Sequence, residues 1–158
     1  MSTARLPRQI PYIIGNEACE RFSFYGMRNI LVPFLISSVL LSYLPADARD
    51  GAAKDVFHTF VIGVYFFPLL GGWLSDRYFG KYNTVLWFSL VYCAGHACLA
   101  AFDDNRTGFY AGLFLIAFGS GGIKPLLVSF VGDQFDQSNK DLAKIVFDAF
   151  YWTINFGS

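Results

Sequence analysis

Two acidic residues and one basic residue lie within five positions of one another, inside a long apolar segment near the start of the chain. Glu17 and Glu20 are the only glutamates of the sequence, and Arg21 follows directly. On a helix, residues three and four positions apart share one face, which Tyr25 and Arg28 roughly continue. An ionised side chain costs at least about 2.5 kcal/mol at bilayer depth. These side chains must therefore face protein or a water-filled cavity.

The balance of charge in this group indicates what chemistry it can do. Two carboxylates beside one guanidinium leave one carboxylate without a full partner, and such a group can take up and release a proton. We therefore expect Glu17 and Glu20 to take part in proton coupling, as a proton-driven carrier requires. The alternative is a structural salt bridge between helices.

A second costly charge, Lys124, lies in a later apolar segment between a run of glycines and Pro125. We expect it to compete with Arg21 for the glutamates or to bind a carboxylate of a substrate; otherwise it extends to the lipid headgroups. His58 lies two helical turns before Tyr65, and histidine titrates near physiological pH. We weigh a proton-shuttling role for His58 against simple packing.

Several classes of function find no support in the sequence. The formal net charge is zero, so nothing points to a nucleic-acid partner. Three cysteines give no complete disulfide framework. The set Cys93, His96 and Cys98 matches no standard zinc spacing. No nucleophile–base pair or phosphate loop suggests an enzyme. We expect no metal and no cofactor, with protons as the coupling ion.

The composition favours lipid as the solvent, since 54% of the 158 residues are hydrophobic and only 15% are charged. A membrane-spanning helix needs roughly 20 mostly apolar residues. The sequence predicts an all-α membrane protein, a single partial N-terminal bundle over residues 1–158 with about four and a half spans. The predicted helices are residues 12–44, 56–75, 85–102, 109–131 and 145–158, the last one truncated. Because the fifth ends inside a span, we expect the chain to be a fragment.

Basic residues alternate between the predicted loops. The N-terminal tail has Arg5 and Arg8 and the second loop Arg77 and Lys81, while the third loop has only Arg106. The 4–5 loop adds Lys140 and Lys144, and the first loop has Arg49 and Lys54. The positive-inside rule therefore places the N-terminus in the cytoplasm. We expect an integral protein of the cytoplasmic (inner) membrane.

Four segments of the chain resemble motifs of one transporter superfamily and of one family within it. Residues 72–81, with Asp76 and Arg77, resemble the cytoplasmic loop signature of the major facilitator superfamily. Residues 17–25 resemble the E-x-x-E-R-F-x-Y-Y motif of the proton-dependent oligopeptide transporters, with phenylalanine in place of the first tyrosine. Residues 118–135 and 150–158 resemble the fourth- and fifth-helix motifs of the same family.

The resemblance implies roles for individual residues. The peptide's carboxylate would be bound by Arg21 and Lys124, and its amino end would be near Asn155. The remaining implied roles are proton coupling by Glu17, Glu20 and His58, pocket lining by Tyr25 and Tyr65, and gating by Asp76 and Arg77. The family has twelve or more spans in two bundles, so a C-terminal bundle would be missing from this chain.

The sequence therefore predicts proton-coupled symport of di- and tripeptides by alternating access. One alternative is a symporter of the same family that carries another small solute, such as an amino acid or nitrate. Another is a non-transporting membrane fragment that needs a partner chain. An intact pair of glutamates with Arg21 and Lys124 favours peptides.

Overall fold

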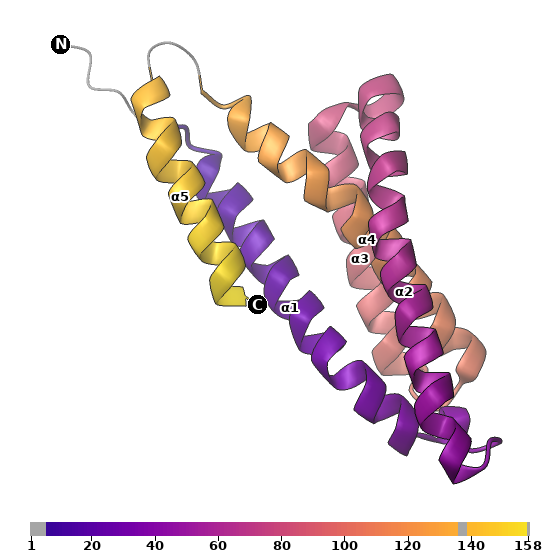
Figure 1. Cartoon of the computed structure of the whole chain (residues 1–158). Helices are drawn as coiled ribbons and strands as arrows, with labels where there is room; N and C mark the ends of the chain where they lie inside the picture. The colour runs from indigo at the N-terminus through magenta and orange to yellow at the C-terminus, as the bar shows by residue number, and fades with distance from the viewer. Residues whose placement is uncertain (1–5, 136–138, 158) are drawn as a thin grey trace. The chain divides into compact units, whose positions relative to one another are not determined.

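The computed structural model describes residues 6–135 and 139–157, which form helices joined by short turns (Figure 1). The helices are α1 (Ile10–Ser37), α2 (Ala46–Leu74), α3 (Gly80–Ala101), α4 (Arg106–Gly132) and α5 (Lys140–Gly157). No strand occurs in these two ranges, so the predicted all-α class is confirmed. Arg5, named above in the N-terminal tail, and Ser158, the predicted end of the fifth helix, lie outside the described residues.

The chain divides into two compact units. Unit 1 comprises residues 1–27 and 127–158, and unit 2 comprises residues 28–126. Both α1 and α4 therefore contribute to each unit. In unit 1, α5 buries Val146 and Phe150, which lie four positions apart on one face. The single bundle predicted from the sequence stays a prediction.

The first helix is shorter than predicted, ending at Ser37 rather than at residue 44. The hydroxyl of Ser37 donates to the carbonyl oxygen of Pro33 at 2.9 Å, and Ser38 is extended, with φ −79° and ψ 165°. Hydroxyls that bind nearby carbonyls compete with the helical hydrogen-bond ladder. A short 3₁₀-helix, Val39–Leu41, follows before the chain turns into α2.

The second helix begins ten residues earlier than predicted, at Ala46 instead of residue 56. Its first turns are polar but rich in good helix formers, and Lys54 forms an i, i+4 ion pair with Asp50 at 2.6 Å. Hydropathy detects the part of a helix that suits lipid, and therefore misses a polar extension. For the same reason α5 begins at Lys140 rather than at residue 145, in a segment with Asp141 and Lys144.

The predicted loop between the second and third helices is itself helical. The π-helix Ser75–Phe79 joins α2 to α3, so the two form a hairpin (Figure 1). Gly80 has φ +72°, a left-handed conformation that glycine adopts without steric cost. The chain therefore reverses at Gly80, and α3 begins there rather than at residue 85.

Glycines bring α4 close to α2 and α3 within unit 2. A Cβ atom added at Gly71 on α2 would lie 2.5 Å from Cα of Gly122 on α4. A Cβ atom at Gly119 would lie 2.8 Å from the backbone nitrogen of Tyr92 on α3. Small residues at such crossings let helix backbones approach closely, as is common in membrane proteins. The glycine run of α4 is thus explained by packing.

Two helical stretches of the described residues are long and apolar enough to cross a membrane. One covers residues 46–101, and therefore both arms of the hairpin, and the other is α4. Charged residues interrupt the apolar sequence of α1 and α5, including Glu17, Glu20 and Arg21 in α1. The number of spans predicted from the sequence stays a prediction.

Candidate functional site

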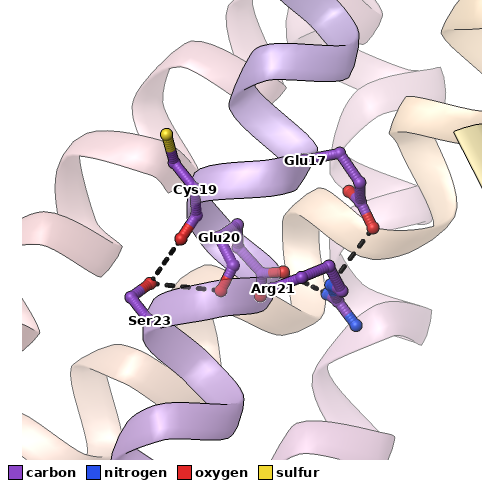
Figure 2. Close-up of polar contacts among 5 residues, drawn as sticks. All are labelled: Glu17, Cys19, Glu20, Arg21 and Ser23. Carbon is purple, nitrogen blue, oxygen red and sulfur yellow. Dashed lines mark hydrogen bonds and ion pairs between the residues drawn. The ribbon is translucent and has the colours of Figure 1, made fainter. Parts of the chain in front are cut away.

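Three of the charged residues of α1 form one buried cluster, hereafter the α1 charge cluster: Glu17, Glu20 and Arg21. Nε of Arg21 lies 3.1 Å from Oε1 of Glu17, and Nη2 of Arg21 contacts Oε2 of Glu20 (Figure 2). The side chains of Arg21, Glu17 and Glu20 are only 7%, 5% and 3% exposed. One guanidinium therefore bridges two carboxylates, as the helical spacing predicts.

Neighbouring residues of α1 surround the charge cluster. The hydroxyl of Ser23 donates to the backbone carbonyls of Cys19 at 2.8 Å and Glu20 at 3.1 Å (Figure 2). The rings of Phe24 and Tyr25 each have their centroid 5.9 Å from Cζ of Arg21. A cation within about 6 Å of an aromatic face is stabilised by the ring quadrupole. Tyr25 thus lies next to Arg21, whereas its predicted role in lining a substrate pocket stays a prediction.

The α1 charge cluster contains two acids and one base. With both carboxylates ionised, the cluster carries a net charge of −1 in a place nearly closed to solvent. Buried charges interact strongly with their surroundings, because the interior screens them poorly. Addition of one proton would bring the cluster to neutrality. The predicted role of Glu17 and Glu20 in proton coupling stays a prediction.

Asn16 is a half-buried polar residue next to this site in the sequence, and the sequence reasoning missed it. Its side-chain nitrogen is buried and has no hydrogen-bond partner within the part of the chain that the structure describes. It lies one residue before Glu17 and four before Glu20, on the helical segment that carries the α1 charge cluster. The i, i+4 spacing to Glu20 was the available signal.

The two site residues predicted on α2, His58 and Tyr65, lie in unit 2. His58 and Tyr65 are both exposed, and Tyr65 is 75% exposed, so their two-turn spacing gives an open stripe on α2. Arg28 of α1 lies near the start of this stripe, with Cζ 5.6 Å from the ring centroid of Phe57. The sequence reasoning placed Arg28 on the stripe of α1 and did not connect it with α2.

Lys124 is half-buried on α4, directly before Pro125. It belongs to unit 2, whereas the α1 charge cluster belongs to unit 1. The predicted competition of Lys124 with Arg21 for the glutamates therefore stays a prediction. So does the predicted joint binding of a carboxylate by Arg21 and Lys124.

The predicted gating residues, Asp76 and Arg77, are exposed and lie in the π-helix at the turn of the hairpin. The predicted amide, Asn155, is exposed on α5 and donates from Nδ2 to the carbonyl oxygen of Tyr151 at 2.8 Å. The π-helix gives Asp76 and Arg77 a defined backbone, whereas Asn155 is fixed by a bond within its own helix. Their predicted roles are untested.

No group of three or more His, Cys, Asp or Glu side chains suited to hold a metal ion occurs in residues 6–135 and 139–157. Cys93 and Cys98, considered as ligands from the sequence, are free thiols on α3. Nothing among the described side chains therefore supports a metal centre.

Comparison with solved structures defines the class of the chain. It matches a crystal structure of the POT family transporter PepTSo with a TM-score of 0.94 and 72% identity, over 98% of this chain and 30% of that one. An auto-inhibited POT family peptide transporter matches with a TM-score of 0.91 and 74% identity, over 96% of this chain and 30% of that one. This is the fold of a helical transporter of the major facilitator superfamily.

Sequence comparison gives the family. A profile of the POT family (PTR2) matches residues 82–158. Peptide transporter family 1 of Drosophila melanogaster is 43% identical over 161 residues, and solute carrier family 15 member 2 of Danio rerio is 41% identical over 160 residues; each match covers 96% of this chain. The chain belongs to the POT family, whose members are integral membrane proteins. The resemblance read from its motifs is confirmed.

The chain spans only part of these relatives. It covers 20% of the fly protein and 21% of the fish protein. Any activity of a complete transporter is therefore a proposal for this chain.

Proposed function

We propose that this chain is part of a symporter that couples inward proton flow to the uptake of di- and tripeptides by alternating access. The α1 charge cluster carries the proposal, because two buried carboxylates share one guanidinium. The names of similar proteins support the substrate class, since the fly relative is called a peptide transporter. Protons serve as the coupling ion, and no other cofactor is required.

The proposal gives each predicted residue a task. Glu17, Glu20 and His58 exchange protons; Arg21 and Lys124 bind the peptide's carboxylate. The pocket is lined by Tyr25 and Tyr65, and Asn155 binds the peptide near its amino end. Asp76 and Arg77 belong to the cytoplasmic gate. Protonation of the α1 charge cluster weakens its hold on Arg21 and so favours a change of state.

The setting of the symporter follows from the family and from the charges. The chain works in the lipid bilayer of the cytoplasmic (inner) membrane, with its N-terminus in the cytoplasm. A C-terminal bundle supplies the second wall of the peptide site. The support for this orientation is the concentration of basic residues in the N-terminal tail, around the hairpin turn and in the first turns of α5.

The test is uptake of labelled dialanine into liposomes that contain the complete transporter, with and without an inward proton gradient. We expect accumulation only with the gradient, blocked by excess unlabelled dipeptide. Lys124→Ala should strongly reduce uptake of the dipeptide, since the variant lacks a cation that binds the peptide's carboxylate. Absence of accumulation by correctly oriented protein would refute the proposal.

A second candidate function is symport of another small solute. One solved POT family transporter, 26% identical to this chain, is described in complex with 5-aminolevulinic acid, which is not a peptide. Competition of dipeptides, amino acids and nitrate for the same uptake would separate the two candidates. Peptides should compete best if the main proposal holds.

A further inference from the structure

A groove of about 570 Å³ lies between α2 and α4 of unit 2. On α2 the lining residues lie on one face between Asp55 and Phe67 and include Ile62 and Phe66 but not Tyr65. On α4 the lining residues are Tyr110, Leu113, Phe114 and Ala117. Ligand sites in proteins commonly have volumes of about 300–1,000 Å³ and mostly apolar walls with few polar groups. The groove fits this description.

The groove lies on the face of α4 that also carries Lys124. Ala117 precedes Lys124 by seven residues and Leu113 precedes it by eleven, so the three align along one side of the helix. Ionisable residues inside membrane spans face the protein interior or a water-filled cavity rather than lipid. The face of α4 that lines the groove therefore belongs to the interior of the transporter.

The distance between Lys124 and the groove suits a small peptide. Seven residues of helix correspond to about 10 Å, and helical side chains lean toward the N-terminus of their helix. The lysine side chain therefore leans from Lys124 toward Ala117 and the near end of the groove. A carboxylate bound by Lys124 would leave an attached side chain within reach of Phe114 and Phe66.

We propose that the groove between α2 and α4 receives a large apolar side chain of a peptide whose carboxylate is held at Lys124. The inference rests on the proposed function and adds a preference to it. In a cavity that contains water, apolar walls favour apolar side chains. The aromatic rings of Phe66 and Phe114 can pack edge-on or offset against a phenyl ring.

Ile62 offers a way to test the groove without touching the charged residues. It is 68% exposed and lines the groove, so Ile62→Trp would fill part of the volume. Leu90 on α3 is 53% exposed and does not line the groove, so Leu90→Trp is the matched control. The complete transporter is assayed for labelled dialanine uptake, with Ala-Phe or unlabelled Ala-Ala as the competitor.

We expect Ala-Phe to compete about tenfold or more better than Ala-Ala in the unchanged protein, as burial of a phenyl group predicts. Ile62→Trp should reduce this ratio to about threefold or less while dialanine uptake persists, and Leu90→Trp should leave the ratio unchanged. Persisting dialanine uptake also shows that the variant folds.

Other outcomes overturn the inference. An unchanged ratio in Ile62→Trp, with the affinity for each peptide also unchanged, would mean that apolar side chains bind elsewhere. An equal loss of affinity for both peptides, measured as binding in detergent, would mean that another helix of the transporter or a lipid covers the groove. Both results leave the peptide symporter standing, whereas absence of dialanine uptake by the unchanged protein would refute the proposed function itself.

Discussion

At the scale of single residues, a substitution of Glu20 tests whether the α1 charge cluster couples protons to transport. Glu20→Gln keeps the shape of the side chain and removes its ability to ionise. We expect loss of all gradient-driven dipeptide accumulation, while exchange of labelled for unlabelled dipeptide across proteoliposomes without a gradient persists. Asp148→Asn, at an exposed acid on α5, is the control and should accumulate normally. Gradient-driven accumulation by Glu20→Gln would remove this residue from the coupling mechanism.

Arg21 should contribute to the stability of the fold, since its guanidinium forms ion pairs with two buried carboxylates. Removal of one partner from a buried ion pair costs about 3–5 kcal/mol, because a charge is left without compensation. Arg21→Met should therefore lower the unfolding temperature of the complete transporter in detergent. The double variant Arg21→Met with Glu20→Leu should recover part of the loss, since it also removes a carboxylate. An unfolding temperature unchanged by Arg21→Met would show that the cluster contributes nothing to stability.

At the scale of helices, the crossing of α2 and α4 depends on the absence of side chains. A Cβ atom at Gly71 would lie 2.5 Å from Cα of Gly122, whereas one at Gly72 would meet no atom within 4 Å. Gly71→Ala should destabilise the protein by at least the roughly 1–3 kcal/mol typical of overpacking, because the obstacle is backbone. Gly72→Ala should be neutral or stabilising by up to about 1 kcal/mol. Equal melting temperatures for the two variants would contradict this crossing.

The helices also show what the sequence could and could not predict. The spacing of Glu17, Glu20 and Arg21 predicted their shared face, because adjacent turns of one helix determine it. The close approach of Gly71 to Gly122 could not be predicted, since it depends on a tertiary crossing between distant segments. The π-helix at Ser75–Phe79 was also missed, because its polar sequence resembles that of an ordinary loop. Local spacing therefore predicted the ion pairs, and the crossing and the turn required the structure.

At the scale of the whole molecule, the proposed orientation places the connection between α3 and α4 outside the cell and the start of α5 inside. In a background of the complete transporter with every cysteine replaced by serine or alanine, including Cys19, Cys93 and Cys98, Asp104→Cys and Asp141→Cys each introduce one exposed thiol. An impermeant maleimide should label Asp104→Cys in intact cells and Asp141→Cys only after the membrane is opened. Dipeptide uptake by both variants is the control for folding.

The labelling result tests whether the basic residues of the chain determine its orientation in the membrane. Basic residues hold loops in the cytoplasm, whereas acidic residues contribute little to orientation. Lys140 and Lys144 flank Asp141 and should therefore dominate its position. Labelling of Asp141→Cys in intact cells, with protection of Asp104→Cys, would invert the orientation. The exposed residues Asp76 and Arg77 of the hairpin turn would then face the outside and could not form a cytoplasmic gate, although the buried ion pairs of α1 would keep their chemistry.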